Sequence, residues 1–313
     1  MNYDGIDQNA IELIAKSTIL SYEKMLAATA KSSFFLCVLP ECCIGSREED
    51  VFINIPNNPA VLHVGKERSI VEKQLSKLGY FRWAAGGVGI KIVTSDDKSV
   101  LITVRKDKNA PSYAGHDTIG AGLSSNEKEW LYPLCTALRE GMEEIIIKDK
   151  DKIIYPKFSD ILYGMSYDIR CITQQNKAIS NYRNILGSCE LKGVSAKFID
   201  FGDYKKRLTV RFRDQEEITP NILVNMDSGC GGIDVMTVIE INVESTLDEL
   251  VLLDGEETNS IAFDRIINAW ELDGNKPTGR IISSWKSGQK IKTQQPGSVV
   301  PHTKQLFEVL SKI

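Results

Sequence analysis

Apolar and polar residues along the first part of the chain follow the spacings of both helices and strands. From about Ile6 to Ala30 the apolar residues recur at intervals that suit an amphipathic helix. Short apolar runs at 34–39 and 51–55 predict strands, and a second helix is expected over 67–78, where a glycine follows. We interpret residues 1–84 as a small α+β extension at the N-terminus.

The pattern changes near residue 85 and then predicts a β-hairpin. Val88 to Thr94 and Ser99 to Arg105 are apolar runs typical of strands, and the polar residues 95–98 between them are typical of a tight turn. A loop containing glycines follows over 116–123, and a helix is expected over 132–147. This region therefore has the order hairpin, glycine loop, helix.

The remainder of the chain mixes strand and helix patterns. We expect residues 85–313 to form one domain, interrupted by an insertion at about 152–231. The insertion and the final section contain a helical segment near 179–185, strands at 194–201, 207–212, 234–243 and 249–253, a mixed segment at 261–270, and a closing helix at 302–313.

Composition and charge restrict the class of protein. The chain has 313 residues, of which 42% are hydrophobic and 26% are charged, as in ordinary globular proteins. Its formal net charge of -4 provides no basic field for a nucleic-acid backbone, so nucleic acid is not an expected partner. The apolar runs are shorter than the roughly 20 residues that span a bilayer, and acidic residues near the N-terminus do not suit a secretory signal. We expect a cytoplasmic protein without a membrane segment.

The cysteines are expected to be reduced thiols. Seven cysteines are scattered along the chain, and an odd, scattered set does not suit a disulfide framework. Cys42 and Cys43 are adjacent, which is compatible with a redox or metal pair, but no CxxC partner or nearby histidine supports that reading. We interpret them as ordinary loop or buried thiols.

A cluster of acids in the predicted helix is the main candidate for chemistry. In the segment Arg139 to Glu144, the residues Glu140, Glu143 and Glu144 are three or four positions apart and converge on one helix face. Their repulsion requires a cation or a basic group, and Arg139 can pair with Glu143 at the i, i+4 spacing. Carboxylates suit Mg²⁺, or Mn²⁺ in its place. The six residues alone equally fit a solvated helix face with charge pairs.

The order of hairpin, glycine loop and R-E-x-x-E-E helix resembles the Nudix hydrolases, whose signature is G-x5-E-x7-R-E-U-x-E-E-x-G-U, with U a bulky aliphatic residue. The resemblance covers about residues 86–151 and 232–313. It implies an α+β fold of the Nudix type, an α/β/α sandwich. The sequence departs from the signature at four points: the loop is about three residues longer, neither Glu127 nor Glu129 is in register for the next glutamate, Gly141 replaces an aliphatic residue, and Ile146 replaces the closing glycine.

The resemblance also implies roles for particular residues. Glu143 and Glu144 would be the principal metal ligands, and Glu140 a further ligand or the base that activates water. Arg139 would orient a glutamate. The remaining roles fall to the backbone carbonyl of Gly120 or Gly122 as a metal ligand, and to Glu256 and Glu257 as a further acid from a later loop.

Four candidate residues also have an ordinary structural reading. Glu256 and Glu257 also fit an exposed acidic turn. Arg105 either contacts phosphate or is a solvated strand end, and His116 either stacks on a base or is structural.

The resemblance implies hydrolysis, dependent on magnesium, of a diphosphate linkage in a nucleotide derivative such as a nucleotide sugar, ADP-ribose or a dinucleotide. The alternatives are a catalytically inactive module that binds nucleotides, and an interaction scaffold whose extra segments carry the function. Those extra segments are expected to shape the substrate pocket or to form a homodimer interface.

Overall fold

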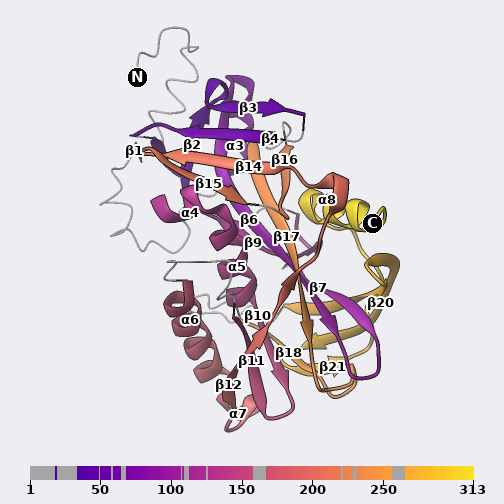
Figure 1. Cartoon of the computed structure of the whole chain (residues 1–313). Coiled ribbons are helices and arrows are strands. Elements are labelled where there is room, and N and C mark those ends of the chain that lie inside the picture. Colours follow the sequence, from indigo (N-terminus) through magenta and orange to yellow (C-terminus); the bar gives the residue numbers. More distant parts are fainter. Residues whose placement is uncertain are drawn as a thin grey trace. The chain divides into compact units, whose positions relative to one another are not determined.

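The computed structural model describes residues 18–19, 34–48, 50–57, 59–64, 68–106, 108, 113–124, 126–157, 167–219, 221–227, 231–255 and 265–313. These fall into two compact units, one within residues 1–86, 122–136 and 205–235 and the other within 87–121, 137–204 and 236–313. Figure 1 draws and labels their helices and strands. Both contain helices and strands, so the predicted α+β class is confirmed. Four elements have residues in both units: β6 (Tyr80–Val93), β9 (Gly120–Leu123), α5 (Pro133–Glu144) and β17 (Gly232–Asn242).

The first unit has one layer of antiparallel strands in the order β1-β5-β2-β6. Its apolar core joins Leu36 and Val38 of β2 to Leu62 of β5 and Leu75 of the helix α3. Burial of these side chains attaches the helix to the sheet. The elements of this unit are β1 (Thr18–Ile19), β2 (Phe34–Pro40), the 3-10 helix η1 (Glu41–Cys43), β3 (Ile44–Arg47), β4 (Asp50–Ile55), β5 (Ala60–Val64), α3 (Arg68–Lys77), α4 (Glu127–Leu131), β14 (Arg207–Phe212), β15 (Gln215–Thr219) and β16 (Leu223–Asp227).

The predictions for the N-terminal part have mixed outcomes. The strands at 34–39 and 51–55 and the helix at 67–78 are confirmed as β2, β4 and α3. The predicted helix at 6–30 lies outside the described residues except for Thr18–Ile19. That pair forms strand β1, so the helix prediction is wrong there. The reason is that Thr18 and Ile19 pair with the edge of β5, a long-range contact that apolar spacing cannot predict.

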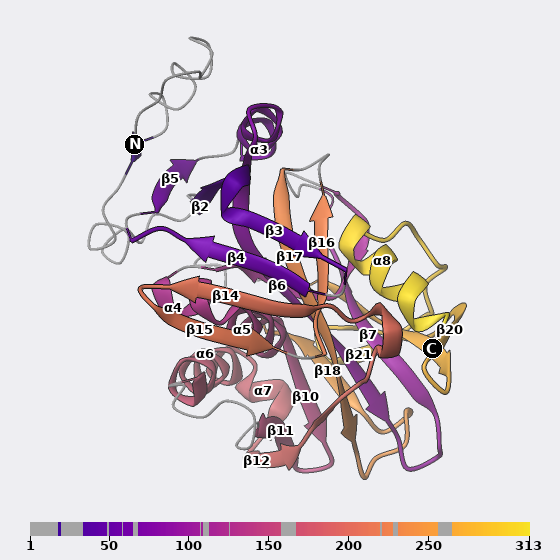
Figure 2. The same ribbon diagram turned by 45° about the horizontal axis from the view of Figure 1, so that its top comes forward.

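A second sheet of the first unit has the order β15-β14-β4-β3 (Figure 2). Strands β14 and β4 are parallel, and Val210 is paired with Ile53. Alternate residues of a strand point to the same side, and here the buried side carries an apolar set from both strands. That set is Val51, Ile53, Ile55, Leu208, Val210 and Phe212.

The outermost strand β15 places an acid on this apolar side. Glu217 lies opposite Val210 in the β14–β15 register, and residues directly opposite each other share one face of the sheet. Its Oε2 atom is buried and has no hydrogen-bond partner among the described residues. Because burial disfavours the charged form, the pKa of Glu217 is raised from 4.5 to about 8. Its neighbour Ile218 is 50% exposed on the other face.

A buried arginine connects the elements of the first unit. Arg82 lies 2.8 Å from Glu72 through Nε and 2.8 Å from Asp234 through Nη2. Its side chain is only 5% exposed, so both acids are needed to compensate for its desolvation. A Cβ atom on Gly232 would lie 2.1 Å from Nη2 of Arg82, so the guanidinium occupies the space that a side chain would need.

The second unit has an antiparallel sheet in the order β6-β7-β19-β20-β21. The predicted hairpin is confirmed, with Ile90 paired to Ile102 and Val93 to Ser99. The strand β7 has buried residues on both faces, including Leu101 and Ile102. The strands of this sheet not yet given are β7 (Ser99–Arg105), β8 (Asp117–Thr118), β13 (Lys197–Phe198), β19 (Ile266–Asp273), β20 (Lys276–Lys286) and β21 (Gln289–Ile291). The same unit contains the 3-10 helix η2 (Gly202–Tyr204) and the helix α8 (Pro301–Leu310).

Helices lie on both faces of β6 in this unit. A Cβ atom on Gly141 of α5 would lie 2.1 Å from Val88, whereas a Cβ atom on Gly89 would lie 3.1 Å from Leu306 of α8. Adjacent strand residues point to opposite faces, so α5 and α8 cover opposite faces of the same strand. Trp270 of β19 also packs against Phe307 of α8, with ring centroids 5.2 Å apart.

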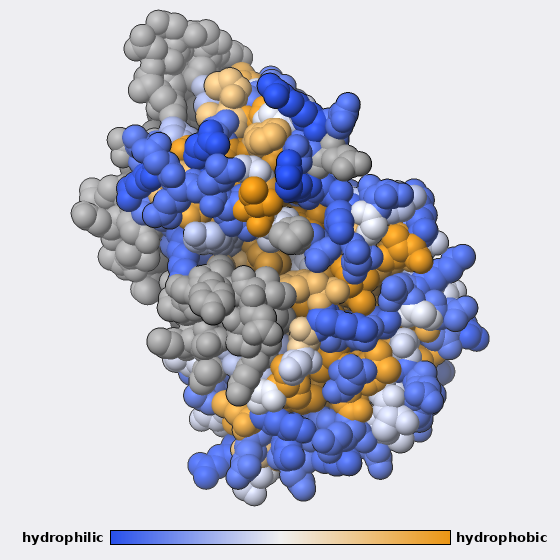
Figure 3. Space-filling view, viewed as in Figure 1, coloured by the Kyte–Doolittle hydropathy of each residue, from blue (hydrophilic) through white to orange (hydrophobic). Residues whose placement is uncertain are grey.

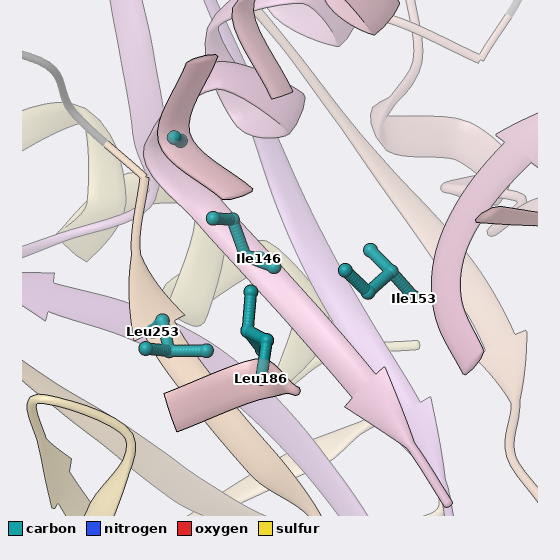
Figure 4. Close-up of a cluster of buried hydrophobic side chains, with 5 residues drawn as sticks. Ile146, Ile153, Leu186 and Leu253 are labelled. Atoms are coloured by element: carbon teal, nitrogen blue, oxygen red, sulfur yellow. The ribbon is translucent and has the colours of Figure 1, made fainter. Parts of the chain in front are cut away.

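A further sheet of the second unit has the order β12-β11-β10-β18, and helices α6 and α7 pack against it. Figure 4 shows Leu186 of α7 near Ile146 of β10 and Leu253 of β18, with Ile153 of β11 beside them. The predicted helical segment near 179–185 is thus part of two helices. The bounds are β10 (Ile145–Asp149), β11 (Lys152–Lys157), α6 (Tyr167–Asn181), α7 (Arg183–Leu186), β12 (Glu190–Ser195) and β18 (Val251–Asp254).

The surface is mainly hydrophilic on the face that Figure 3 shows, with apolar residues visible in patches. Within the described ranges, we find no helix that has both the length and the apolar character needed to cross a membrane.

We predict that Glu217→Gln removes a pH dependence of stability. The folded-state pKa is above the unfolded one, so the wild type is most favoured at low pH, where both states are protonated, and loses stability as the pH rises from 4.5 towards 8. At about 1.4 kcal/mol per pKa unit, the loss is on the order of a few kcal/mol. Urea unfolding at low and at high pH measures it.

Glu216, the exposed acid next to Glu217 in β15, supplies the control for that measurement. Glu216→Gln should change the free energy of unfolding by less than about 0.5 kcal/mol at either pH. If Glu217→Gln gives the same pH profile as the wild type, the carboxyl is not desolvated in the folded protein.

Candidate functional site

The C-terminal end of α5 carries the acid cluster. Ala137, Leu138 and Met142 are buried, and the helical periodicity leaves the acids on another side of the helix. The side chains of Glu140, Glu143 and Glu144 are 17%, 13% and 10% exposed. Three carboxylates are therefore largely removed from water within two helical turns, where their repulsion is strongest.

Arg139 holds two of these acids. Its Nη1 atom lies 2.6 Å from Oε1 of Glu140 and 2.9 Å from Oε2 of Glu143. The i, i+4 pair predicted from the sequence is therefore present. Because Arg139 is itself 11% exposed, these are charge-assisted contacts in a largely dry environment.

Glu144 is next to a second arginine that the sequence did not indicate. Nη1 of Arg265 lies 3.7 Å from Oε1 of Glu144, and the same guanidinium contacts Asp254 at 2.6 Å. The side chain of Asp254 is 1% exposed and that of Arg265 is 9% exposed. The site thus includes a fourth acid and a second base. Asp254 follows the predicted strand at 249–253 and begins an acidic stretch, whereas Arg265 lies in the segment at 261–270 that the sequence left mixed.

Helix α5 ends abruptly, and distant residues satisfy its last carbonyl groups. The predicted helix at 132–147 stops at Glu144, because the next residue, Ile145, begins the strand β10. Without a loop, the terminal carbonyls need partners from elsewhere. Gln175 of α6 donates to the carbonyl of Met142 at 3.3 Å, and the amide of Gly255 donates to that of Glu144 at 2.8 Å.

Two glycines allow the acid helix to lie close to its neighbours. A Cβ atom on Gly120 would lie 2.7 Å from Cα of Gly141 and 3.4 Å from Oε2 of Glu144. The glycine at 141, where Nudix hydrolases have an aliphatic residue, thus has a physical reason here: α5 packs directly on Val88 and on the backbone at Gly120. Gly120 thus lies next to Glu144, and the role of its carbonyl as a metal ligand stays a prediction.

Arg105 is the last residue of β7 and His116 directly precedes β8, and both contact residues outside the acid cluster. Arg105 binds the fully buried Asp117, with Nε 2.7 Å from Oδ1. His116 contacts the ring of Tyr113 edge-on at 5.8 Å and lies 3.1 Å from the carbonyl of Ala114 through Nδ1. Their proposed contacts with phosphate and base stay predictions.

The other predicted site residues lie elsewhere or cannot be placed. Gly122 follows Gly120 in β9 but belongs to the first unit. Glu256 and Glu257 lie outside the described residues. The last described residue before them is Gly255, which bonds to the backbone of Glu144.

The side chains at the end of α5 carry more negative than positive charge. Four negative charges come from the acids Glu140, Glu143, Glu144 and Asp254, and two positive charges come from Arg139 and Arg265. The net charge of the group is therefore -2. Carboxylate oxygens are the preferred ligands of Mg²⁺. In the described part of the chain, however, no group of three or more His, Cys, Asp or Glu side chains is gathered around one point as a metal site.

Comparison with known proteins gives one similarity. No protein-family model and no curated protein matches the chain. Among solved structures, it is similar to the crystal structure of a NUDIX hydrolase from Alicyclobacillus acidocaldarius, with 13% sequence identity and a TM-score of 0.24. The similarity covers 54% of this chain and 75% of that one. A similarity of this size assigns neither fold nor activity, which must be argued from the residues.

We predict that Gly141→Ala destabilises the second unit. The added methyl group would lie 2.1 Å from Val88, so α5 or β6 must move. Overpacking of this kind costs about 1–3 kcal/mol, which exceeds the roughly 1 kcal/mol that alanine contributes to a helix. Chemical denaturation measures the change. Gly45→Ala, whose methyl group would lie 3.8 Å from the nearest atom, is the control; equal stability of both variants would contradict the close packing.

Proposed function

We propose that this chain is a hydrolase, dependent on Mg²⁺ or Mn²⁺, that cleaves a diphosphate linkage in a nucleotide derivative. The observation that carries the proposal is the acid cluster of Glu140, Glu143 and Glu144, largely buried at the end of α5. Acids held this close in a dry site require positive charge beyond what Arg139 supplies. A divalent cation compensates for the remaining -2 and also binds phosphate oxygens.

Each residue of the site has a role in this proposal. Glu143 and Glu144 would hold the ion, with the carbonyl of Gly120 as the further ligand that the resemblance implies. Glu140 accepts a proton from the attacking water, and Arg139 keeps Glu140 and Glu143 in orientation. When bound, the metal would neutralise negative charge on the phosphate oxygens and lower the pKa of the attacking water. Addition of water across the P–O–P bridge then yields two phosphate products.

The layering of the second unit supports a fold of the Nudix type. Helices α5 and α8 cover opposite faces of β6, as an α/β/α sandwich requires. The acid helix follows the β6–β7 hairpin and the glycine strand β9 in the expected order. Function is still argued from the site, because one fold can host many activities.

A second candidate is a module that binds a nucleotide without cleaving it. It is favoured by the position of Arg139, which already engages two of the three helix acids, and by the lack of a gathered metal cluster among the described residues. In this case the acids and arginines serve as a structural network.

Assay of the full chain separates these candidates. With Mg²⁺ or Mn²⁺ and a panel of nucleotide sugars, dinucleotides, capped nucleotides and ADP-ribose, we expect release of a nucleoside monophosphate, measured by chromatography. Glu143→Gln and Glu144→Gln should each lower kcat/KM by about 100-fold or more. The exposed Glu216→Gln should leave it unchanged.

Two results would count against the enzyme. Nucleotide binding without turnover under every metal supports the binding module instead. Turnover that survives both substitutions and removal of metal by a chelator would mean that the chemistry lies outside this acid cluster.

A further inference from the structure

A buried pair from the segment after the acid helix lies beside the acid cluster. Asp254 is the last residue of β18, and the β10–β18 register pairs Ile145 with Asp254. Ile145 directly follows Glu144, so this register brings Asp254 to the end of α5. The side chain of Asp254 is 1% exposed and that of Arg265 is 9% exposed, so both charges are buried.

Asp254 fixes the guanidinium of Arg265 at two points. Nε donates to Oδ2 at 2.9 Å and Nη2 donates to Oδ1 at 2.6 Å, which is the two-pronged geometry that arginine forms with a carboxylate. The backbone amide of Arg265 also donates to Oδ2, at 3.1 Å. These contacts fix the plane of the guanidinium. Because the group is rigid and planar, they also fix the position of its third nitrogen, Nη1.

The third nitrogen faces Glu144. Nη1 of Arg265 lies 3.7 Å from Oε1 of Glu144, while Oε2 lies on the side of Gly120. The backbone of Glu144 is held as well, by the hydrogen bond from Gly255. One carboxylate oxygen is thus next to a fixed positive charge, and the other is directed towards the glycine strand.

We propose that Asp254 and Arg265 are positioning residues that orient the carboxylate of Glu144 for metal binding. The inference rests on the proposed function, in which Glu144 is a metal ligand. Groups that hold a ligand in orientation affect metal affinity and turnover without touching the ion. A purely structural pair would instead affect stability alone.

The first unit offers a matched structural comparator. Arg82 forms a similarly buried network with Asp234 and Glu72, and it has no place in the proposed site. Arg265→Lys keeps the charge but loses the planar fork, and Arg82→Lys makes the same change in the other unit. Asp254→Asn and Asp234→Asn form a second matched pair.

The experiment measures Mn²⁺ affinity, kcat, KM and thermal unfolding of the full chain with each substitution. We expect Arg265→Lys and Asp254→Asn to weaken Mn²⁺ binding and to lower kcat by roughly 10- to 100-fold, with a smaller change in KM. Arg82→Lys and Asp234→Asn should lower the unfolding temperature while Mn²⁺ affinity and kcat of the folded protein stay within about twofold of the wild type.

The outcomes separate this inference from the proposed function. If the wild type binds Mn²⁺ and hydrolyses a substrate but Arg265→Lys and Asp254→Asn change only the unfolding temperature, the positioning role is wrong and the enzyme stands. If the wild type neither binds Mn²⁺ nor hydrolyses any substrate of the panel, the proposed function fails, and Glu144 has no ion for which it must be positioned.

Discussion

The contact of helix α5 with its neighbours is the constraint on which the acid site depends. Residues 120 and 141 have room only for hydrogen, because the helix packs on Val88 and on the backbone of β9. Close-packed interiors do not absorb an extra methyl group without displacement. The two glycines therefore set the distance between the acids and the strand beside them, and the hydrogen bonds from Gln175 and Gly255 fix where the helix ends.

Both units bury charged groups, but they do so in different ways. In the first unit one arginine pairs with two acids, and in the second unit two arginines lie among four acids. A buried ion network of balanced charge contributes little net stability, and an unbalanced one costs free energy. The two networks therefore differ in the size of the negative excess, -1 around Arg82 and -2 at the end of α5, and in the gathering of three of the acids on one helix.

The sequence predicted those elements whose signal is local. The hairpin of β6 and β7, the strand β14 and the helices α3 and α8 follow from periodicity and turns, and Arg139 meets Glu143 because both lie in one helix. The end of α5 was not predictable in this way, because the apolar run that starts at Ile145 fits a helix or a strand and only its pairing with β18 decides. Arg265 was missed for the same reason: its partners come from strand register.

The carboxyl of Glu217 also affects how the first unit can meet other chains. Strand β15 lies at an edge of its sheet, and exposed edges are templates on which further strands add and aggregates grow. A further strand added beside β15 would cover the carboxyl of Glu217 more completely. Removing that carboxyl from water costs free energy, so the addition is disfavoured. By this argument the desolvated carboxyl would disfavour the addition of a further strand at β15, while the same desolvation costs the fold stability at high pH.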